Sequence, residues 1–206
     1  MEKRDTAGSV KDLNFPKVTD GHRQIPHLFV NSPVVMRAID FHKKNTLRGL
    51  YQGEIVRVDT NLNGYDIPMT EIEESLIGHP RESLGTFTVK GWVPPHTDPN
   101  VGFSYILVLR AHRAIVHAEG CEPLELKAGM FIMLDTTKPH RLEHGASSIF
   151  TWAAYDNLDT GSENGLNFAL SKILVYLEKW DSLVLEKTGN KLRDVPSTSH
   201  SDSVKD

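Results

Sequence analysis

The spacing of hydrophobic positions changes along the chain, and the longest region has a strand-like pattern. From residue 84 onward, short apolar runs alternate with Gly, Pro and Asp at nearly regular intervals, as short antiparallel strands do. Such a series favours an antiparallel barrel or jelly roll over alternating helices and strands. We expect strands in segments 85–92, 103–110, 113–118, 123–127, 130–134 and 147–155.

The spacing then becomes helical. The pattern predicts an amphipathic helix over about 163–187, because apolar residues recur at intervals of three and four. Its stripe could cover the barrel or bury itself against a second copy of the chain, so a homodimer through this helix stays open. The stripe consists of Leu166, Leu170, Ile173, Leu174, Leu177, Trp180 and Val184, and Gly189-Asn190 would end the helix.

The N-terminal half carries weaker signals. Ser32 before Pro33 is a helix start, with Ser as the N-cap and Pro at the first helical position, and Gly49 would end this helix. Further elements are expected as a half-buried strand in 54–59, a turn in 61–64 and a short acidic helix in 71–76.

Composition limits the number of domains. The chain has 206 residues, of which 39% are hydrophobic, enough for one good core. We expect a mainly β, cupin-like jelly-roll domain over 25–187 with helices at both ends. A flexible segment 1–24 would precede it, and a disordered tail 188–206 would follow.

Charge and cysteine content narrow the class further. The net charge of −4 argues against a broad basic surface for nucleic acid, so a small molecule or a protein side chain is the expected substrate. The single cysteine, Cys121, permits no internal disulfide. We find neither a long apolar run nor the apolar core of a secretory signal, and therefore expect a cytoplasmic protein without a membrane segment.

Three residues have the pattern of a metal site. His96 and Asp98 are two positions apart, so both project from one face of an extended strand. His140 follows a predicted buried strand and would complete a 2-His-1-carboxylate triad, which holds Fe(II) and leaves other positions open. Surface or capping roles are the alternative. Competing ligands in the same region are His112, His117, Glu119 and His144.

Together these motifs resemble a known family. His96-Thr97-Asp98, the apolar strand 103–109, the Gly129 turn with its strand, and Pro139-His140 are similar to the double-stranded β-helix of Fe(II)/2-oxoglutarate-dependent oxygenases, over about residues 85–155. The resemblance implies that the triad binds Fe(II) and that 2-oxoglutarate chelates it as co-substrate. It also implies that the enzyme hydroxylates its substrate.

The resemblance also implies a basic partner for the distal carboxylate of 2-oxoglutarate. Many members have an arginine about ten residues beyond the second histidine, where this chain has Phe150 and Thr151. The JmjC-like hydroxylase subgroup takes this residue from the strand after the His-x-Asp motif, which makes Arg113 the first candidate and Arg110 the second. The alternative for both arginines is a position in a turn that faces solvent. Tyr105 could share the carboxylate or pack in the core.

Trp92 and Trp152 are candidates for the substrate pocket, with core packing as the alternative. Two rival functions remain. One is a cupin-type metal enzyme, a dioxygenase or isomerase, that works without 2-oxoglutarate. The other is a jelly-roll binding module without chemistry, which metal content would distinguish.

Overall fold

The computed structural model describes residues 23–45, 49–59, 61–62, 65–66, 69–78, 82–99, 101–157 and 163–188. The predicted flexible segment 1–24 and tail 188–206 lie outside these ranges, apart from residues 23, 24 and 188. Residues 63–64 of the predicted turn and the Gly189-Asn190 helix stop also lie outside them.

The described residues form three helices and twelve strands. The helices are α1 (Pro33–Lys44), α2 (Met69–Leu76) and α3 (Glu163–Thr188). The first strands are β1 (His27–Phe29), β2 (Ile55–Arg57), β3 (Asn61–Leu62), β4 (Tyr65–Asp66), β5 (Ser83–Lys90) and β6 (Val93–His96). The others are β7 (Phe103–Arg110), β8 (Ala114–Ala118), β9 (Leu124–Leu126), β10 (Met130–Asp135), β11 (His140–Glu143) and β12 (Ile149–Asn157).

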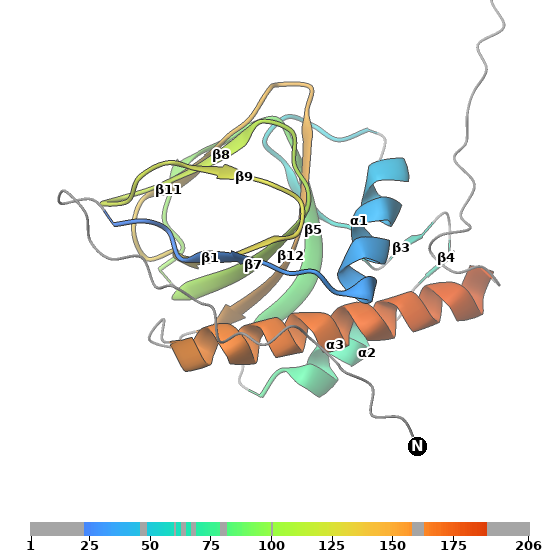
Figure 1. The fold of residues 1–206 in the computed structure, drawn as a ribbon. Coiled ribbons are helices and arrows are strands. Elements are labelled where there is room, and N and C mark those ends of the chain that lie inside the picture. Colours follow the sequence, from blue (N-terminus) through green and yellow to red (C-terminus); the bar gives the residue numbers. More distant parts are fainter. Residues whose placement is uncertain are drawn as a thin grey trace, which may run out of the picture.

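The strands pair in the nested order of a jelly roll. The large sheet has the order β1-β10-β7-β12-β5-β2 and the small sheet β6-β11-β8-β9, while β3 and β4 form a separate hairpin. Strand β5 therefore pairs with β12 and β6 with β11, although each pair is far apart in sequence. The two sheets curve around a common interior (Figure 1). The predicted mainly β jelly roll with flanking helices is confirmed.

Alternation along the strands separates two faces of the large sheet. On β12, Phe150 and Trp152 point toward the small sheet, whereas Ala153 and Tyr155 point toward the helices. We call these the inner face and the outer face. Each has its own apolar cluster, because successive side chains of a strand project to opposite sides.

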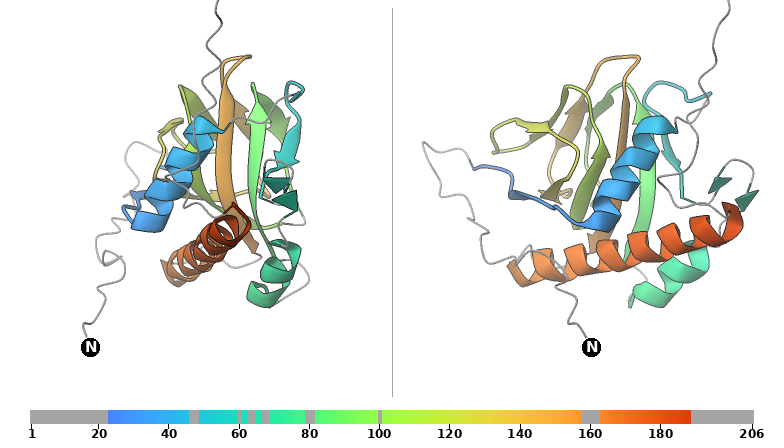
Figure 2. Two further views of the ribbon diagram at one scale, coloured as in Figure 1. Left: turned by 90° about the vertical axis from the view of Figure 1, so that its right-hand side faces the viewer. Right: turned by 45° about the vertical axis from the view of Figure 1, so that its right-hand side comes forward.

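Helices α1 and α3 cover the outer face. The Phe41 ring of α1 packs edge-on against Trp180 of α3 with centroids 5.0 Å apart, and Arg37 pairs with Asp181 at 2.6 Å. Helix α3 lies below the strands in Figure 1 and in both views of Figure 2. The predicted apolar stripe thus braces the barrel of its own chain. The homodimer stays a prediction, for which α3 offers the exposed Phe168, Val175 and Leu185.

Helix α1 begins as predicted and ends earlier. The Ser32 hydroxyl accepts a hydrogen bond from the Val35 N–H, as an N-cap does. The helix ends at Lys44 rather than near Gly49, because Asn45 is extended and both its N–H and its side-chain amide donate to the Phe41 carbonyl.

Among the strands that were not predicted, β1, β3, β4, β6 and β11, two carry site residues. Strand β6 contains Pro94 and Pro95, which usually argue against a strand. It lies at the edge of the small sheet, where a residue without an N–H is tolerated. Strand β11, His-Arg-Leu-Glu, is too short and polar to stand out in the sequence.

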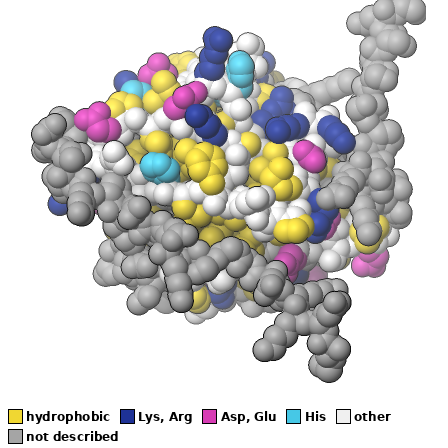
Figure 3. All heavy atoms as spheres, viewed as in Figure 1, with side chains coloured by type: hydrophobic (Ala, Val, Ile, Leu, Met, Phe, Trp, Pro, Cys, Tyr) yellow, Lys and Arg dark blue, Asp and Glu magenta, His cyan; other side chains and the backbone are white. Residues whose placement is uncertain are grey.

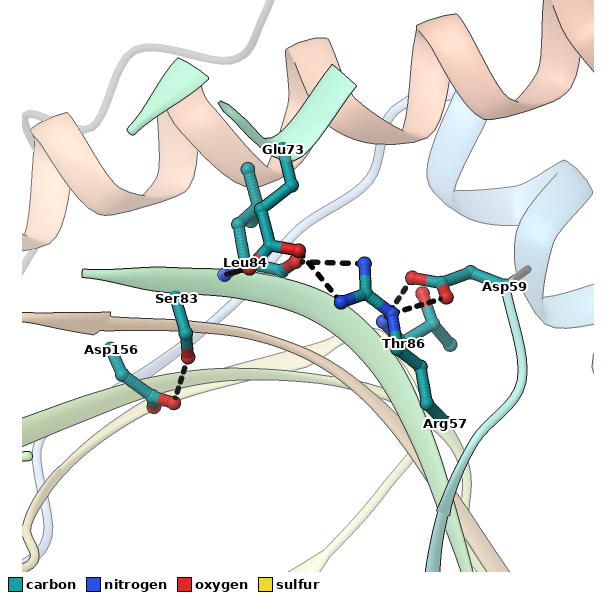
Figure 4. A network of polar contacts seen from close by, with 7 residues as sticks. All are labelled: Arg57, Asp59, Glu73, Ser83, Leu84, Thr86 and Asp156. Carbon is teal, nitrogen blue, oxygen red and sulfur yellow. Dashed lines mark hydrogen bonds and ion pairs between the residues drawn. The ribbon is translucent and has the colours of Figure 1, made fainter. Parts of the chain in front are cut away.

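An ionic network fixes the start of β5 (Figure 4). The Arg57 guanidinium donates to Asp59 at 2.7 Å and to Glu73 of α2 at 2.6 Å. The same two carboxylates accept the backbone N–H groups of Thr86 and Leu84 on β5. Strand β2, helix α2 and strand β5 are thereby joined, and the neighbouring Ser83 donates to Asp156.

On the face drawn in Figure 3, Lys and Arg side chains and Asp and Glu side chains both lie among apolar ones. None of the described helices combines the length and apolar character needed to cross a membrane.

Candidate metal centre

Strand pairing brings the three predicted ligands together. His96 ends β6 and His140 begins β11, and the two residues are direct partners across the small sheet. Asp98 follows β6, and its N–H donates to the Thr136 carbonyl at 2.7 Å. This bond holds the Asp98 loop against the segment that leads into β11.

The ligand atoms converge at one point. Asp98 Oδ2 lies 3.6 Å from His96 Nε2 and 3.5 Å from His140 Nε2, and one ligand atom from each residue lies within 4.8 Å of the others. Three ligands at about 2.1 Å from one ion are themselves separated by roughly 3–3.5 Å. The three side chains could therefore hold a metal ion after small adjustments.

Backbone carbonyls fix the orientation of both imidazoles. His96 Nδ1 donates to the Pro94 carbonyl at 2.8 Å, and His140 Nδ1 donates to the Lys138 carbonyl at 3.0 Å. A carbonyl only accepts, so each Nδ1 carries a proton, and Nε2, the nitrogen that faces Asp98, is the atom left to bind a metal. Metal-binding histidines are usually held in this way. The donor set and its tautomers fit a divalent metal.

The triad is covered on one side and open on the other. His140 is buried at 9% exposure, whereas His96 is 35% and Asp98 42% exposed at the side chain. A metal held here would keep positions accessible to a ligand from the pocket.

A pocket of about 240 Å³ extends from the triad into the barrel. Its wall is mainly apolar and comes from both sheets, including Phe87, Ile106, Val116, Phe150 and Trp152. Beyond the triad, its polar lining residues are Ser104, Thr136, Arg141 and Asp156.

The residues expected to bind 2-oxoglutarate do not line this pocket. Arg113 is exposed in the turn between β7 and β8 with φ of 53°, and Arg110 donates to the His42 carbonyl. Tyr105 is fully buried on the outer face beside Phe131. These placements match the alternatives given above, a turn for Arg113 and a core position for Tyr105.

The two tryptophan candidates separate. Trp152 lies in the pocket wall, where its ring stacks on Phe150 at a centroid distance of 5.2 Å. Trp92 is 47% exposed and lies outside the pocket lining.

The competing ligands lie elsewhere. His117 pairs with Glu143 at 2.9 Å. The adjacent residues Val116 and Leu142 line the pocket, so the side chains of His117 and Glu143 project to the other side of the small sheet. His144 is buried beside Phe150. His112 and Glu119 join no group that could hold a metal among the described residues.

A second carboxylate in the pocket, Asp156, was missed. It is the direct partner of Ser83 on β5 and Ser104 on β7, and accepts a hydrogen bond of 2.6 Å from each hydroxyl. Burial, and then the negative charges of Asp98 and Glu73, raise the pKa of Asp156 against the effect of the two hydroxyls. Alternation along 150–156 could have revealed it, because Asp156 shares a face with Phe150 and Trp152.

A scan of protein-family models and a search of curated proteins find no match for this chain. Solved structures do match. DMSP lyase DddQ from Ruegeria pomeroyi DSS-3 is 22% identical over 38% of this chain and 40% of that chain, with a TM-score of 0.30. The match therefore spans less than half the length of DddQ.

Two further structures match over more of the chain. AviO1 from Streptomyces viridochromogenes Tue57 is 10% identical over 69% of this chain and 92% of that chain, with a TM-score of 0.43. An oxidoreductase of the 2OG-Fe(II) oxygenase family from Burkholderia pseudomallei is 15% identical over 63% and 84%, with a TM-score of 0.39. Such distant likenesses carry no functional assignment.

Proposed function

We propose that this protein is a mononuclear non-haem iron oxygenase that oxidises a substrate bound inside the barrel, with His96, Asp98 and His140 as the iron ligands. The observation that carries the proposal is the convergence of two carbonyl-oriented imidazoles on one carboxylate at the mouth of an apolar pocket. Iron held by such a triad supplies dioxygen chemistry when bound.

The chain's own residues would prepare this chemistry. The carbonyls of Pro94 and Lys138 hold each Nε2 lone pair toward the metal position, so little ordering is needed when the ion binds. The apolar wall around Trp152 excludes water from the substrate. The Asp98 loop, tied to Thr136, keeps the carboxylate between the two imidazoles.

The charges around the pocket favour direct oxidation of the substrate, without 2-oxoglutarate. A dianionic co-substrate needs a cationic anchor, yet the inner wall carries the carboxylate of Asp156. Among the described lining residues, the one Lys or Arg is Arg141, which is 47% exposed and lies 3.9 Å from Glu143. A dioxygenase that puts both oxygen atoms into its substrate needs no 2-oxoglutarate.

A second candidate is the 2-oxoglutarate-dependent enzyme of the family resemblance, with Arg141 as the anchor. The observation in its favour is that Arg141 borders the pocket, although its side chain alternates with those of His140 and Leu142 on β11 and lies on the same side as Glu143. This form differs from the first in requiring that 2-oxoglutarate bind to the metal-loaded protein.

One titration tests both candidates. Metal-free protein is titrated with Mn(II), as a redox-stable substitute for Fe(II), and its melting temperature is measured before and after addition of 2-oxoglutarate. The variants are His96→Ala and, as a matched control, His117→Ala, which removes a histidine outside the triad.

We expect Mn(II) to stabilise the wild type and His117→Ala but not His96→Ala, and 2-oxoglutarate to add nothing. Further stabilisation by 2-oxoglutarate that Arg141→Gln abolishes would establish the second candidate instead. Absence of any Mn(II) effect in the wild type would contradict both and favour a binding module.

A further inference from the structure

The strongest feature that the triad does not use is Asp156 and the row of side chains around it. Ser83, Asp156, Ser104 and Leu134 are direct neighbours on the adjacent strands β5, β12, β7 and β10. They therefore form one row across the inner face of the large sheet. Asp156, Ser104 and Leu134 all line the pocket.

This row lies at the same end of the barrel as the triad. Asp98 belongs to the loop that leads into β7, and Ser104 is the second residue of that strand. Thr136, just after β10, donates to the Gly102 carbonyl and accepts the Asp98 N–H. A group bound at Asp156 therefore lies near the metal position.

Asp156 lacks a cationic partner among the described residues. Its two contacts are the neutral hydroxyls of Ser83 and Ser104, and each hydroxyl donates one hydrogen bond. A carboxylate offers about four acceptor positions, so acceptor capacity remains. A partly buried carboxylate without a counter-ion gains most from a ligand that brings a positive charge.

Beyond Asp156 the inner face becomes apolar. Ala154 is the next inward residue of β12, and its small side chain leaves space between Asp156 and Trp152. Trp152 then packs against Phe150 at 5.2 Å and Phe87 at 5.9 Å between ring centroids. Because alternate residues of a strand are about 6.5–7 Å apart, the backbone positions of Asp156 and Trp152 are separated by roughly 13 Å.

We propose that the substrate is a small amphiphilic amine, whose ammonium group binds Asp156 and whose apolar body lies over Ala154 against Trp152, Phe150 and Phe87. This inference rests on the proposed function only in treating the bound amine as a substrate. The carboxylate, the gap and the rings exist whether or not a metal binds. A pocket of about 240 Å³ suits a molecule of this size rather than a polymer.

Three probes with the same pentyl chain and different head groups test the inference: n-pentylamine, pentan-1-ol and hexanoate. Their affinities for metal-free protein are measured by ligand-observed NMR. We expect the amine to bind at least about tenfold more tightly than the other two, because a charge-assisted hydrogen bond outweighs a neutral one. Equal affinities, or a preference for the alcohol or the acid, would overturn the inference.

Two variants locate the head-group preference. Asp156→Asn should reduce the difference between amine and alcohol to within about twofold. Glu125→Gln removes the same formal charge from an exposed position on β9 and should leave the difference unchanged. If the amide variant does not fold, Asp156→Ser keeps a hydroxyl for its serine neighbours and takes its place. If the Asp156 variants still bind the amine more tightly than the alcohol by about tenfold, the assignment of Asp156 as the ammonium site is contradicted.

Mn(II)-loaded protein separates this inference from the proposed function. Bound Mn(II) broadens nearby ligand protons, so the CH₂ next to the nitrogen should broaden more than the terminal methyl group. Uniform broadening would contradict the assigned orientation. Failure of Mn(II) to bind would contradict the proposed function, whereas the Asp156-dependent amine preference of metal-free protein would still stand.

Discussion

The two faces of the large sheet come from the same strands but differ in what they bury. On the outer face, Leu107, Tyr155 and Ile173 are fully buried in a cluster closed by α1 and α3. On the inner face, the apolar wall is interrupted by Asp156 and opens toward the triad. The outer face thus supplies stability, whereas the inner face keeps polar groups accessible at some cost in stability.

The largest expected effect concerns the outer face. Ile173→Ala removes a fully buried side chain of α3 and should lower the free energy of unfolding by about 2–5 kcal/mol in a denaturant titration. Mn(II) affinity of the folded fraction should not change. Val175→Ala, at a 39% exposed position of the same helix, is the control and should cost less than about 0.5 kcal/mol. Equal losses would contradict this contrast between the covered and open sides of α3.

The next effect concerns the triad. His140→Ala should weaken Mn(II) binding at least about a hundredfold by calorimetry, equivalent to roughly 2.7 kcal/mol, because one of three ligands is lost. His117→Ala should bind Mn(II) like the wild type. Unchanged affinity in His140→Ala would move the metal site away from the triad.

A buried histidine packed beside the outer-face cluster should make the free energy of unfolding depend on pH. His42 stacks on Trp180, and burial, helped by the charge of Arg110, lowers the pKa of His42 to about 3. The folded protein therefore keeps His42 neutral, while the unfolded chain takes up the proton below about pH 6.5. The free energy of unfolding should fall by about 1.4 kcal/mol per pH unit from there toward pH 3.

Denaturant titrations between pH 7 and 4 measure this dependence. The variant His42→Phe keeps a ring beside Trp180 and removes the titrating group. Its free energy of unfolding should therefore fall less steeply with decreasing pH, by a slope that corresponds to about one proton. Identical slopes in the two proteins would show that His42 is not the group responsible.

The smallest effect concerns a residue outside both faces. Arg113 has a positive φ of 53°, which glycine adopts without strain, so Arg113→Gly should raise the free energy of unfolding by up to about 1 kcal/mol. If Arg113 acts only in the turn, binding of Mn(II) and of the pentyl probes is unaffected. A loss of ligand binding in Arg113→Gly would show that Arg113 contributes to the binding site.

Much of the fold could be predicted because its signals are local. The 103–110 strand matches β7, and the helix stripe of 163–187 matches α3 to within a residue, since both elements bury a regular apolar set. Strands β6 and β11 were missed because sheet pairing, rather than local preference, makes the segments Pro94-Pro95 and His-Arg-Leu-Glu extended.

The site divides in the same way. The grouping of His96, Asp98 and His140 was predicted from strand ends and residue types. The side to which a side chain projects was not predicted for Arg110, Arg113 and Tyr105. It depends on the exact turn and on helix packing, which a single sequence does not encode locally. Asp156 went unnoticed because its serine partners come from two other strands.

The nested strand order has a consequence for how the protein folds. His96 and His140 are about forty residues apart and meet only when β6 and β11 pair, while β5 must wait for β12, the last strand of the chain. Such distant pairings make folding slow, because a long loop must close before its contacts form. The triad therefore assembles late, and the appearance of Mn(II) binding during refolding would time the closure of the barrel.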